Sequence, residues 1–372
     1  MAISSNGTTD MATFCFTLLY YDNTIIQKMQ NGNADSPKQF IYPGGATMNI
    51  TRVLATLLAA SGLGGLSINA QAADAYPSRP IRVIIPNGPA SSVDTLTRIV
   101  GNQMTQVIGQ QIVMDNRGGA SGVIGMEIAK LANPDGYTVI TTTSAASTIS
   151  PLLLKNPPFH PLNDFDMVGQ FAVTLNVLVV ANALPVKTVP EFIAYAKSGR
   201  KPFNMASAGV GSQSHLAGAY FVQETKIESL HVPYKGGGPS TASLVAGESQ
   251  WSLIPAPAAM RHVSAKRVRA IGHSLSKRTD LLPGIAPIAE TLPGFDYTGW
   301  MGFSVPRGTP KTVIDKLGST VAKAMTAPEV KKAMAFEATE IVVLGPADFR
   351  KVVADSMVKN ARLIKTVGLK SN

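Results

Sequence analysis

The sequence predicts an α/β protein of two lobes, each built on a mixed, mostly parallel sheet, with two hinge crossings between the lobes. The first observation is that short apolar runs alternate with amphipathic stretches from Arg79 onward, which is typical of βαβ units. The second is that this alternation occurs in two series, followed by stretches of helical periodicity. The third is the length of 372 residues, which suits two domains better than one.

The first series contains apolar runs separated by stretches whose apolar residues recur at helical spacing. The run Ile81-Arg82-Val83-Ile84-Ile85 has the β-branched, apolar character of a buried strand. Turn residues at Asn133-Pro134-Asp135-Gly136 separate the second helical stretch from the third apolar run. We predict strands at 81–85, 111–114 and 137–141, and helices at 92–108 and 122–131.

The second series predicts strands at 176–180, 203–206, 230–233, 251–254 and 268–271, with helices at 189–196, 212–223 and 240–246. A strand at 297–305 follows, and the remainder reads as mostly helical, at 311–325, 327–335 and 346–367. Because these last helices are amphipathic, we expect them to return and cover the first lobe. Lobe 1 is then 73–177 plus 303–372, lobe 2 is 178–302, and the cleft between them is the expected ligand site.

Residues 48–72 have the three parts of a secretory signal peptide. Arg52 stands in a short start, an apolar run follows, and Ala70-Gln71-Ala72 supplies the small residues of a cleavage site. The run is too short and too rich in glycine for a good membrane span. We therefore predict export with cleavage after Ala72, and we interpret residues 1–47 as a mis-called extension ahead of a true start at Met48.

The net charge of +10 belongs to the part of the chain that follows the predicted signal, since the charges of the first 72 residues cancel. A basic field raises the local concentration of anions. The basic residues are scattered, without the runs typical of nucleic-acid binding, so a small anion is the expected partner. The chain's one cysteine, Cys15, precedes the predicted mature start, and its five histidines form no pair with metal-ligand spacing. We expect no metal and no cofactor.

Three loops, at 86–94, 207–214 and 234–240, each follow a predicted strand and precede a predicted helix. Small residues let the backbone approach a ligand, and the first N–H groups of a helix have no internal partner. Together with the helix dipole, these groups can bind an anion at the carboxyl ends of parallel strands. Any one loop is also compatible with an ordinary turn. The predicted ligand-binding residues of these loops are Ala90, Ser91, Ser92, Ala208, Gly209, Gly211, Ser212, Gly236 and Gly237.

An enzyme is the alternative. Gly272-His273-Ser274-Leu275-Ser276 nearly matches the nucleophile elbow Gly-x-Ser-x-Gly, but its last position is serine and no clear helix follows. A secreted serine hydrolase using Ser274 is the second hypothesis, and we predict that the chain is not an enzyme. His215, which follows the second loop, is the histidine that could face the cleft.

Several motifs recur in an order and spacing that resemble the Bug/TctC family, the substrate-binding components of tripartite tricarboxylate transporters. They lie at 76–82, 116–122, 132–138, 207–212, 232–239 and 308–310. The resemblance implies a periplasmic-binding-protein (Venus flytrap) fold, a periplasmic location, membrane transporter subunits as partners and a monomer. It also implies that loop N–H groups hold a ligand carboxylate, often through water. Asp94 matches a family aspartate that would organise the loop or a water, and Tyr234 begins a family signature at the cleft.

One segment departs from the family pattern. The family's first loop usually carries Pro-Gly-Gly, where this chain has Pro89-Ala90-Ser91. Losing both glycines restricts the backbone and adds a hydroxyl. We also expect the hydroxyls of Ser92, Thr143, Ser144 and Ser147 to add donors near the ligand. We expect the ligand to be a small carboxylate, either a dicarboxylate or an aromatic acid.

Overall fold

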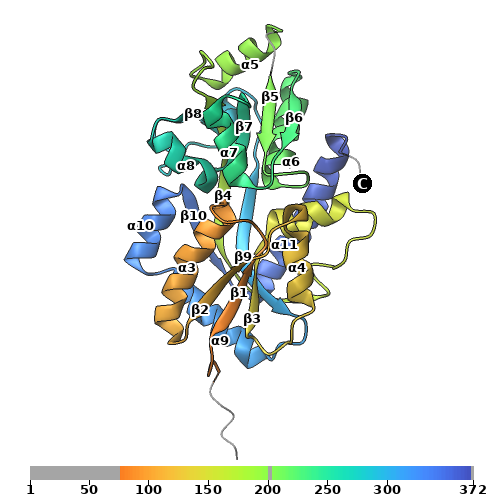
Figure 1. Ribbon diagram of the computed structural model, residues 1–372, viewed down its shortest axis with the longest axis vertical. Helices are drawn as coiled ribbons and strands as arrows, with labels where there is room; N and C mark the ends of the chain where they lie inside the picture. Colours follow the sequence, from red (N-terminus) through yellow and green to blue (C-terminus); the bar gives the residue numbers. More distant parts are fainter. Residues whose placement is uncertain (1–75, 200–202, 370–372) are drawn as a thin grey trace, which may run out of the picture. The chain divides into compact units, whose positions relative to one another are not determined.

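The structure is a computed structural model and describes residues 76–199 and 203–369 (Figure 1). The predicted extension at 1–47 and the predicted signal at 48–72 lie outside the described residues. The described strands form one hydrogen-bonded path in the order β2-β1-β3-β9-β4-β7-β5-β6, with β10 and β8 both pairing β4. None of the described helices is both long and apolar enough to cross a membrane.

The first lobe, as we use the term, is the part around β1, β2, β3, β9 and β10. Parallel pairs join β1 (Ile81–Ile85) to β2 (Ile112–Asn116) and to β3 (Thr138–Thr143). Antiparallel pairs join β9 (Thr298–Pro306) to β3 and to β4 (Phe165–Ala181), and β10 (Thr339–Leu344) to β4. The sheet is therefore mixed, with its parallel part at the start of the chain.

The second lobe is the part around β5 to β8. Here β5 (Asn204–Ser207) lies parallel to β6 (Leu230–Pro233) and to β7 (Trp251–Pro255). Both β7 and β8 (Val268–His273) pair antiparallel with the end of β4. Strand β4 takes part in both lobes, because its residues up to Leu175 pair with β9 and those from Asn176 pair with β7 and β8.

Helices cover both faces of the first-lobe sheet (Figure 1). One face packs on α3 (Ser92–Ile108), α9 (Lys311–Ala324) and α10 (Pro328–Phe336), and the other packs on α4 (Val123–Lys130) and α11 (Pro346–Thr366). Neighbouring residues of a strand point to opposite faces. Met301 and Phe303 accordingly join the first of these cores, whereas Trp300 joins the second.

The second-lobe sheet is covered in the same way. Helices α5 (Val189–Lys197) and α6 (Gln213–Thr225) cover one face, and α7 (Gly237–Ala246) and α8 (Ala256–Ser264) cover the other. Three buried aromatic rings anchor the first of these cores: Phe192 and Phe221 lie 5.5 and 5.6 Å from Trp251, measured between ring centroids. The predicted α/β fold with two lobes is confirmed.

Three elements were not expected from the sequence. The C-terminal part contains the strand β10 between two helices, the first half of β4 extends the predicted strand at 176–180 toward the N-terminus, and α8 follows β7 directly. The stretch Thr339–Leu344 is β-branched, but only its antiparallel pairing with β4 makes it a strand. The sequence analysis assigned no element to this stretch and therefore missed β10.

Candidate functional site

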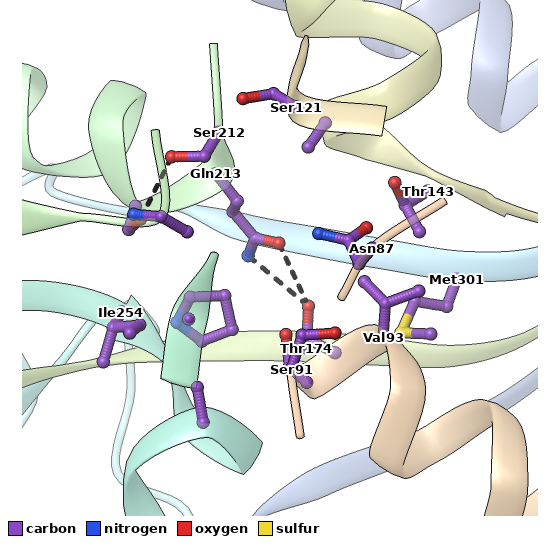
Figure 2. A pocket seen from close by; sticks show the side chains of 17 residues that line it. Asn87, Ser91, Val93, Ser121, Thr143, Thr174, Ser212, Gln213, Ile254 and Met301 are labelled. Carbon is purple, nitrogen blue, oxygen red and sulfur yellow. Dashed lines mark hydrogen bonds between the residues drawn. The ribbon is translucent and has the colours of Figure 1, made fainter. Parts of the chain in front are cut away.

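A cavity of about 50 Å³ lies where loops of both lobes meet (Figure 2). Its volume corresponds to a few water molecules, so a ligand that enters must displace water or part the lobes. Every side chain that lines it is uncharged. Hydroxyl and amide groups alternate with apolar walls, of which Ile254 and Met301 are the largest.

Four of the described helices begin at this cavity. The lining includes Ser92 and Val93 at the start of α3, Gln213 and Ser214 at the start of α6, Gly237 at the start of α7, and Pro255, the N-cap of α8. Within the described chain, no hydrogen-bond partner is present for the backbone N–H groups of the first two residues of α3 and of α6. The positive ends of these helix dipoles therefore point at a cavity that no charged side chain lines. Such a cavity favours an anionic ligand.

The first loop is held by two reciprocal hydrogen bonds. Ser91 Oγ accepts from the N–H of Asp94 at 3.2 Å and caps α3, while Asp94 Oδ2 accepts from the N–H of Ala90 at 2.9 Å. Asp94 Oδ1 accepts from Arg98 Nε at 2.8 Å and from Asn116 Nδ2 at 2.9 Å. The buried Asp94 carboxylate is thus occupied within the loop and does not line the cavity.

Ala90 has a φ of 59°, the left-handed region that favours glycine. It belongs to the segment Pro89-Ala90-Ser91, where the resemblance noted in the sequence implies Pro-Gly-Gly. The backbone thus keeps a conformation suited to glycine although the residue is alanine. The hydrogen bond from its N–H to Asp94 holds that conformation.

The second loop is held by serine hydroxyls. Ser212 caps α6 by accepting from the N–H of His215 at 3.2 Å, and Ser214 Oγ accepts from the N–H of Ala208 at 2.9 Å. Gly209 and Gly211 have φ values of 118° and 80°, which an alanine would adopt only with strain. These bonds aim the first turn of α6 at the cavity.

His215 also stabilises the second loop. Its Nδ1 accepts from the N–H of Gly211 at 3.2 Å, and its ring stacks on that of His231 with centroids 4.0 Å apart. Burial, reinforced by the charge of a protonated His231, lowers the pKa of His215 to about 4. His215 is therefore neutral at pH 7 and lies outside the cavity lining.

Polar contacts join the two lobes at the cavity. Ser121 Oγ of the first lobe donates to the carbonyl of Val210 at 2.6 Å, and Ser150 Oγ donates to that of Gly211 at 3.1 Å. Figure 2 shows Gln213 reaching from the start of α6 toward Thr174 on β4. These bonds hold the lobes against each other in this structure.

The predicted site residues fall into two groups. Six line the cavity: Ser91, Ser92, Thr143, Ala208, Ser212 and Gly237. The others lie outside its lining: Ala90, Asp94, Ser144, Ser147, Gly209, Gly211, Tyr234 and Gly236. Tyr234 bonds Ser249 through its hydroxyl at 3.2 Å, and Ser144 lines a different cavity.

Sequence reasoning missed several lining residues. Gln213 and Ser214 lie in the second predicted loop, 207–214, and begin α6. The sequence could therefore have predicted them as lining residues. Thr174 and Met301 lie inside strands, where no local signal marks the residues that face a cleft. Ser121 lies two residues after a glycine pair and has a φ of 51°, an unusual conformation that serine does not predict.

Ser274 has a structural role. It is fully buried, its Oγ accepts from the N–H of Asn176 at 2.8 Å, and it donates to the carbonyl of Tyr297. The neighbouring His273 uses Nδ1 to accept from the N–H of Leu275. A nucleophile needs an exposed hydroxyl with an adjacent base, and Ser274 has neither.

The comparisons with known proteins agree with this architecture. The sequence model described as tripartite tricarboxylate transporter family receptor, TctC, matches residues 96–369. Protein BugT of Bordetella pertussis (strain Tohama I) is 30% identical over 325 residues, which cover 87% of this chain and 99% of that protein. A UPF0065 protein from the tcbD-tcbE intergenic region of Pseudomonas sp. (strain P51) is 35% identical over 294 residues, 78% of this chain and 87% of that protein.

Solved structures give the same answer. The R. palustris protein Rpa4515, solved with adipate, has a TM-score of 0.77 at 28% identity, covering 79% of this chain and 98% of that one. The periplasmic binding protein BugD has a TM-score of 0.76 at 27% identity, covering 80% and 100%. MatC from Rhodopseudomonas palustris, solved with malate, has a TM-score of 0.73 at 25% identity, covering 78% and 100%. The chain therefore belongs to the TctC family of tripartite tricarboxylate transporter receptors, the Bug-type solute-binding proteins.

Proposed function

We propose that this protein captures a small carboxylate in the cavity between its lobes, outside the cytoplasmic membrane, and presents it to a tripartite tricarboxylate-type transporter. The observation that carries the proposal is the uncharged cavity on which four helix starts converge. Adipate and malate, the ligands named for two related structures, are both dicarboxylates. They support the same ligand class here.

The proposed mechanism is closure of the lobes around the anion. Free N–H groups at the starts of α3 and α6 would bind the carboxylate, and the hydroxyl of Ser92 would add a donor. Uncharged dipoles stabilise an anion without a buried ion pair, whose desolvation would hinder reopening. The ligand can then both bind and leave without the separation of a buried ion pair.

The organisation around this site is also proposed. The chain acts as a monomer without a metal or cofactor, is exported by a cleaved signal, and divides into lobes near 73–177 plus 303–372 and 178–302, although β9 pairs with first-lobe strands already from Thr298. The change of partners along β4 supports a crossing within that strand. The membrane subunits of the transporter would bind the closed form.

Isothermal titration tests the ligand class. We expect saturable binding of at least one acid from a panel of adipate, malate, other dicarboxylates and aromatic acids. Ser92→Phe places a bulky side chain in the cavity lining and is expected to abolish this binding. Ser264→Phe makes the same change at an exposed position on α8 and should leave it intact. A folded protein that binds none of these acids would contradict the proposal.

A further inference from the structure

One side chain in the cavity reaches from the second lobe to β4, the strand that both lobes share (Figure 2). Gln213 is the first residue of α6, and it lines the cavity. Its Nε2 donates to Asn176 Oδ1 at 2.6 Å and lies 3.4 Å from Thr174 Oγ1. Thr174 pairs with the first lobe and Asn176 with the second. The carboxamide of Gln213 therefore lies at the point where β4 passes from one lobe to the other.

Two neighbours hold this carboxamide in place. Asn176 is fully buried, and its own amide donates to the carbonyl of Leu253 at 2.9 Å, so the oxygen that Gln213 bonds is fixed. A Cβ added at Gly299 of β9 would lie 2.5 Å from the carboxamide carbon of Gln213. This is well inside van der Waals contact, so the carboxamide packs directly on the backbone of β9. A side chain held by packing and by a fixed partner keeps one rotamer, and Gln213 thus forms a rigid wall of the cavity.

This wall lies beside the place where the carboxylate of the ligand would bind. The backbone N–H of Gln213 is one of the free donors at the start of α6, so a carboxylate on this N–H has the Gln213 side chain as its immediate neighbour. The space left between the lobes is about 50 Å³. The side chain therefore fills room that the rest of a longer ligand would need. Because its amide donors are directed at Asn176 and Thr174, Gln213 acts on the ligand by its volume.

On the basis of the carboxylate capture proposed above, we propose that Gln213 determines the length of the ligand. With Gln213 in place, the cavity accepts a short acid, and each further methylene group of the ligand meets the carboxamide or forces the lobes apart. Without this side chain, the additional methylene groups find room beside β4. A pocket discriminates against one methylene group by about tenfold or more, so the effect on affinity is large enough to measure.

Gln213→Ala tests this role, with the straight-chain dicarboxylates from malonate to suberate as probes. Titration calorimetry measures the affinity for each acid in the unaltered protein and in the variant. Alanine favours a helix, so α6 is retained, and the affinity for suberate relative to succinate should rise by about tenfold or more. Gln223→Ala makes the same change further along α6, outside the cavity lining, and should leave this ratio unchanged.

Gly299→Ala tests the same wall from the side of β9. The added methyl group would overlap the Gln213 carboxamide and displace it, so the binding of every acid in the series should weaken by about tenfold. In the double variant with Gln213→Ala the overlap is gone, and the added methyl group should change the affinities little. Such non-additivity is expected only if the two residues act on each other.

Each outcome decides the role of Gln213. If Gln213→Ala leaves the ratio of suberate to succinate affinity within about twofold of that of the unaltered protein, the proposal is wrong, while carboxylate capture itself stands. Equal losses from Gly299→Ala with and without Gln213→Ala would also overturn it. If neither the unaltered protein nor Gln213→Ala binds any of these dicarboxylates, the role assigned to Gln213 is wrong, and the binding of aromatic acids then decides whether carboxylate capture stands.

Discussion

The candidate site depends on residues whose polar groups are already committed and on others whose groups are free. Asp94, Ser91 and Ser214 use their side chains to hold loop backbone. The N–H groups that begin α3 and α6 have no partner within the described chain. The side chains that hydrogen-bond to the loops thus fix the direction of the free backbone N–H donors. These donors are therefore oriented before a ligand binds.

Asp94 gives the prediction at this scale. Asp94→Asn places an amide N–H₂ among the three donors that now bond the carboxylate, so at least one buried bond is lost. We expect the free energy of unfolding to fall by about 1–3 kcal/mol and carboxylate affinity to fall as well. Urea denaturation and titration calorimetry measure the two effects.

Asp315→Asn is the matched control, since Asp315 pairs with Lys311 on the exposed side of α9. It should change stability by less than about 1 kcal/mol. If Asp94→Asn behaved like this control, the role of Asp94 in the loop would be refuted.

Among the elements, α6 shows how one helix start is fixed. Ser212 caps it, Gly211 bonds His215 in its first turns, and His215 stacks on His231 of β6. A protonated histidine would sit unfavourably at the positive end of the helix dipole. Keeping His215 neutral therefore stabilises the helix start at the cavity.

This arrangement predicts a pH dependence of stability. The pKa of His215 is about 4 in the folded chain and 6.5 ordinarily, so between these values the unfolded chain binds a proton that the folded chain does not. Stability is complete above pH 6.5 and falls as the pH drops toward 4, by roughly 3 kcal/mol. Burial lowers the pKa of His231 as well, which adds to the effect in the same direction.

Thermal unfolding of the protein and of His215→Gln between pH 4 and 7 checks this prediction. The variant should show a flatter pH dependence because it cannot take up the proton. His262→Gln, on α8, should retain the dependence of the unaltered protein. An identical pH profile for His215→Gln and the unaltered protein would count against the assignment.

For the whole described molecule, the decisive feature is that β4 contributes to the sheets of both lobes while few polar bonds cross the cavity. Leu175 and Asn176 are adjacent in β4, yet they pair with different lobes. The hydrogen bonds from Ser121 and Ser150 to the second loop also join the lobes, away from β4 in the sequence. A continuous strand together with a few bonds between loops is the arrangement expected of a hinge and its closure.

Ser121→Ala tests this closure. Loss of its bond to Val210 should shift the ligand-free protein toward an open form, seen as a larger radius of gyration in small-angle X-ray scattering. Saturating ligand should restore the smaller radius. Ser198→Ala removes an exposed hydroxyl that bonds within the second lobe and should leave the radius unchanged. An unchanged radius in Ser121→Ala would show that this bond does not hold the lobes together.

The sequence by itself determined the α/β series and the positions of the three loops, because periodicity and helix capping depend on neighbouring residues. Ser91 and Ser212 could be placed at helix starts for this reason. Only the tertiary structure decided which side chains face the cavity. Thr174 and Met301 enter it, Ser144 turns to another cavity and Ser274 is buried, since strand register and helix packing select the face. The same holds for β10, whose strand character depends on its pairing with β4.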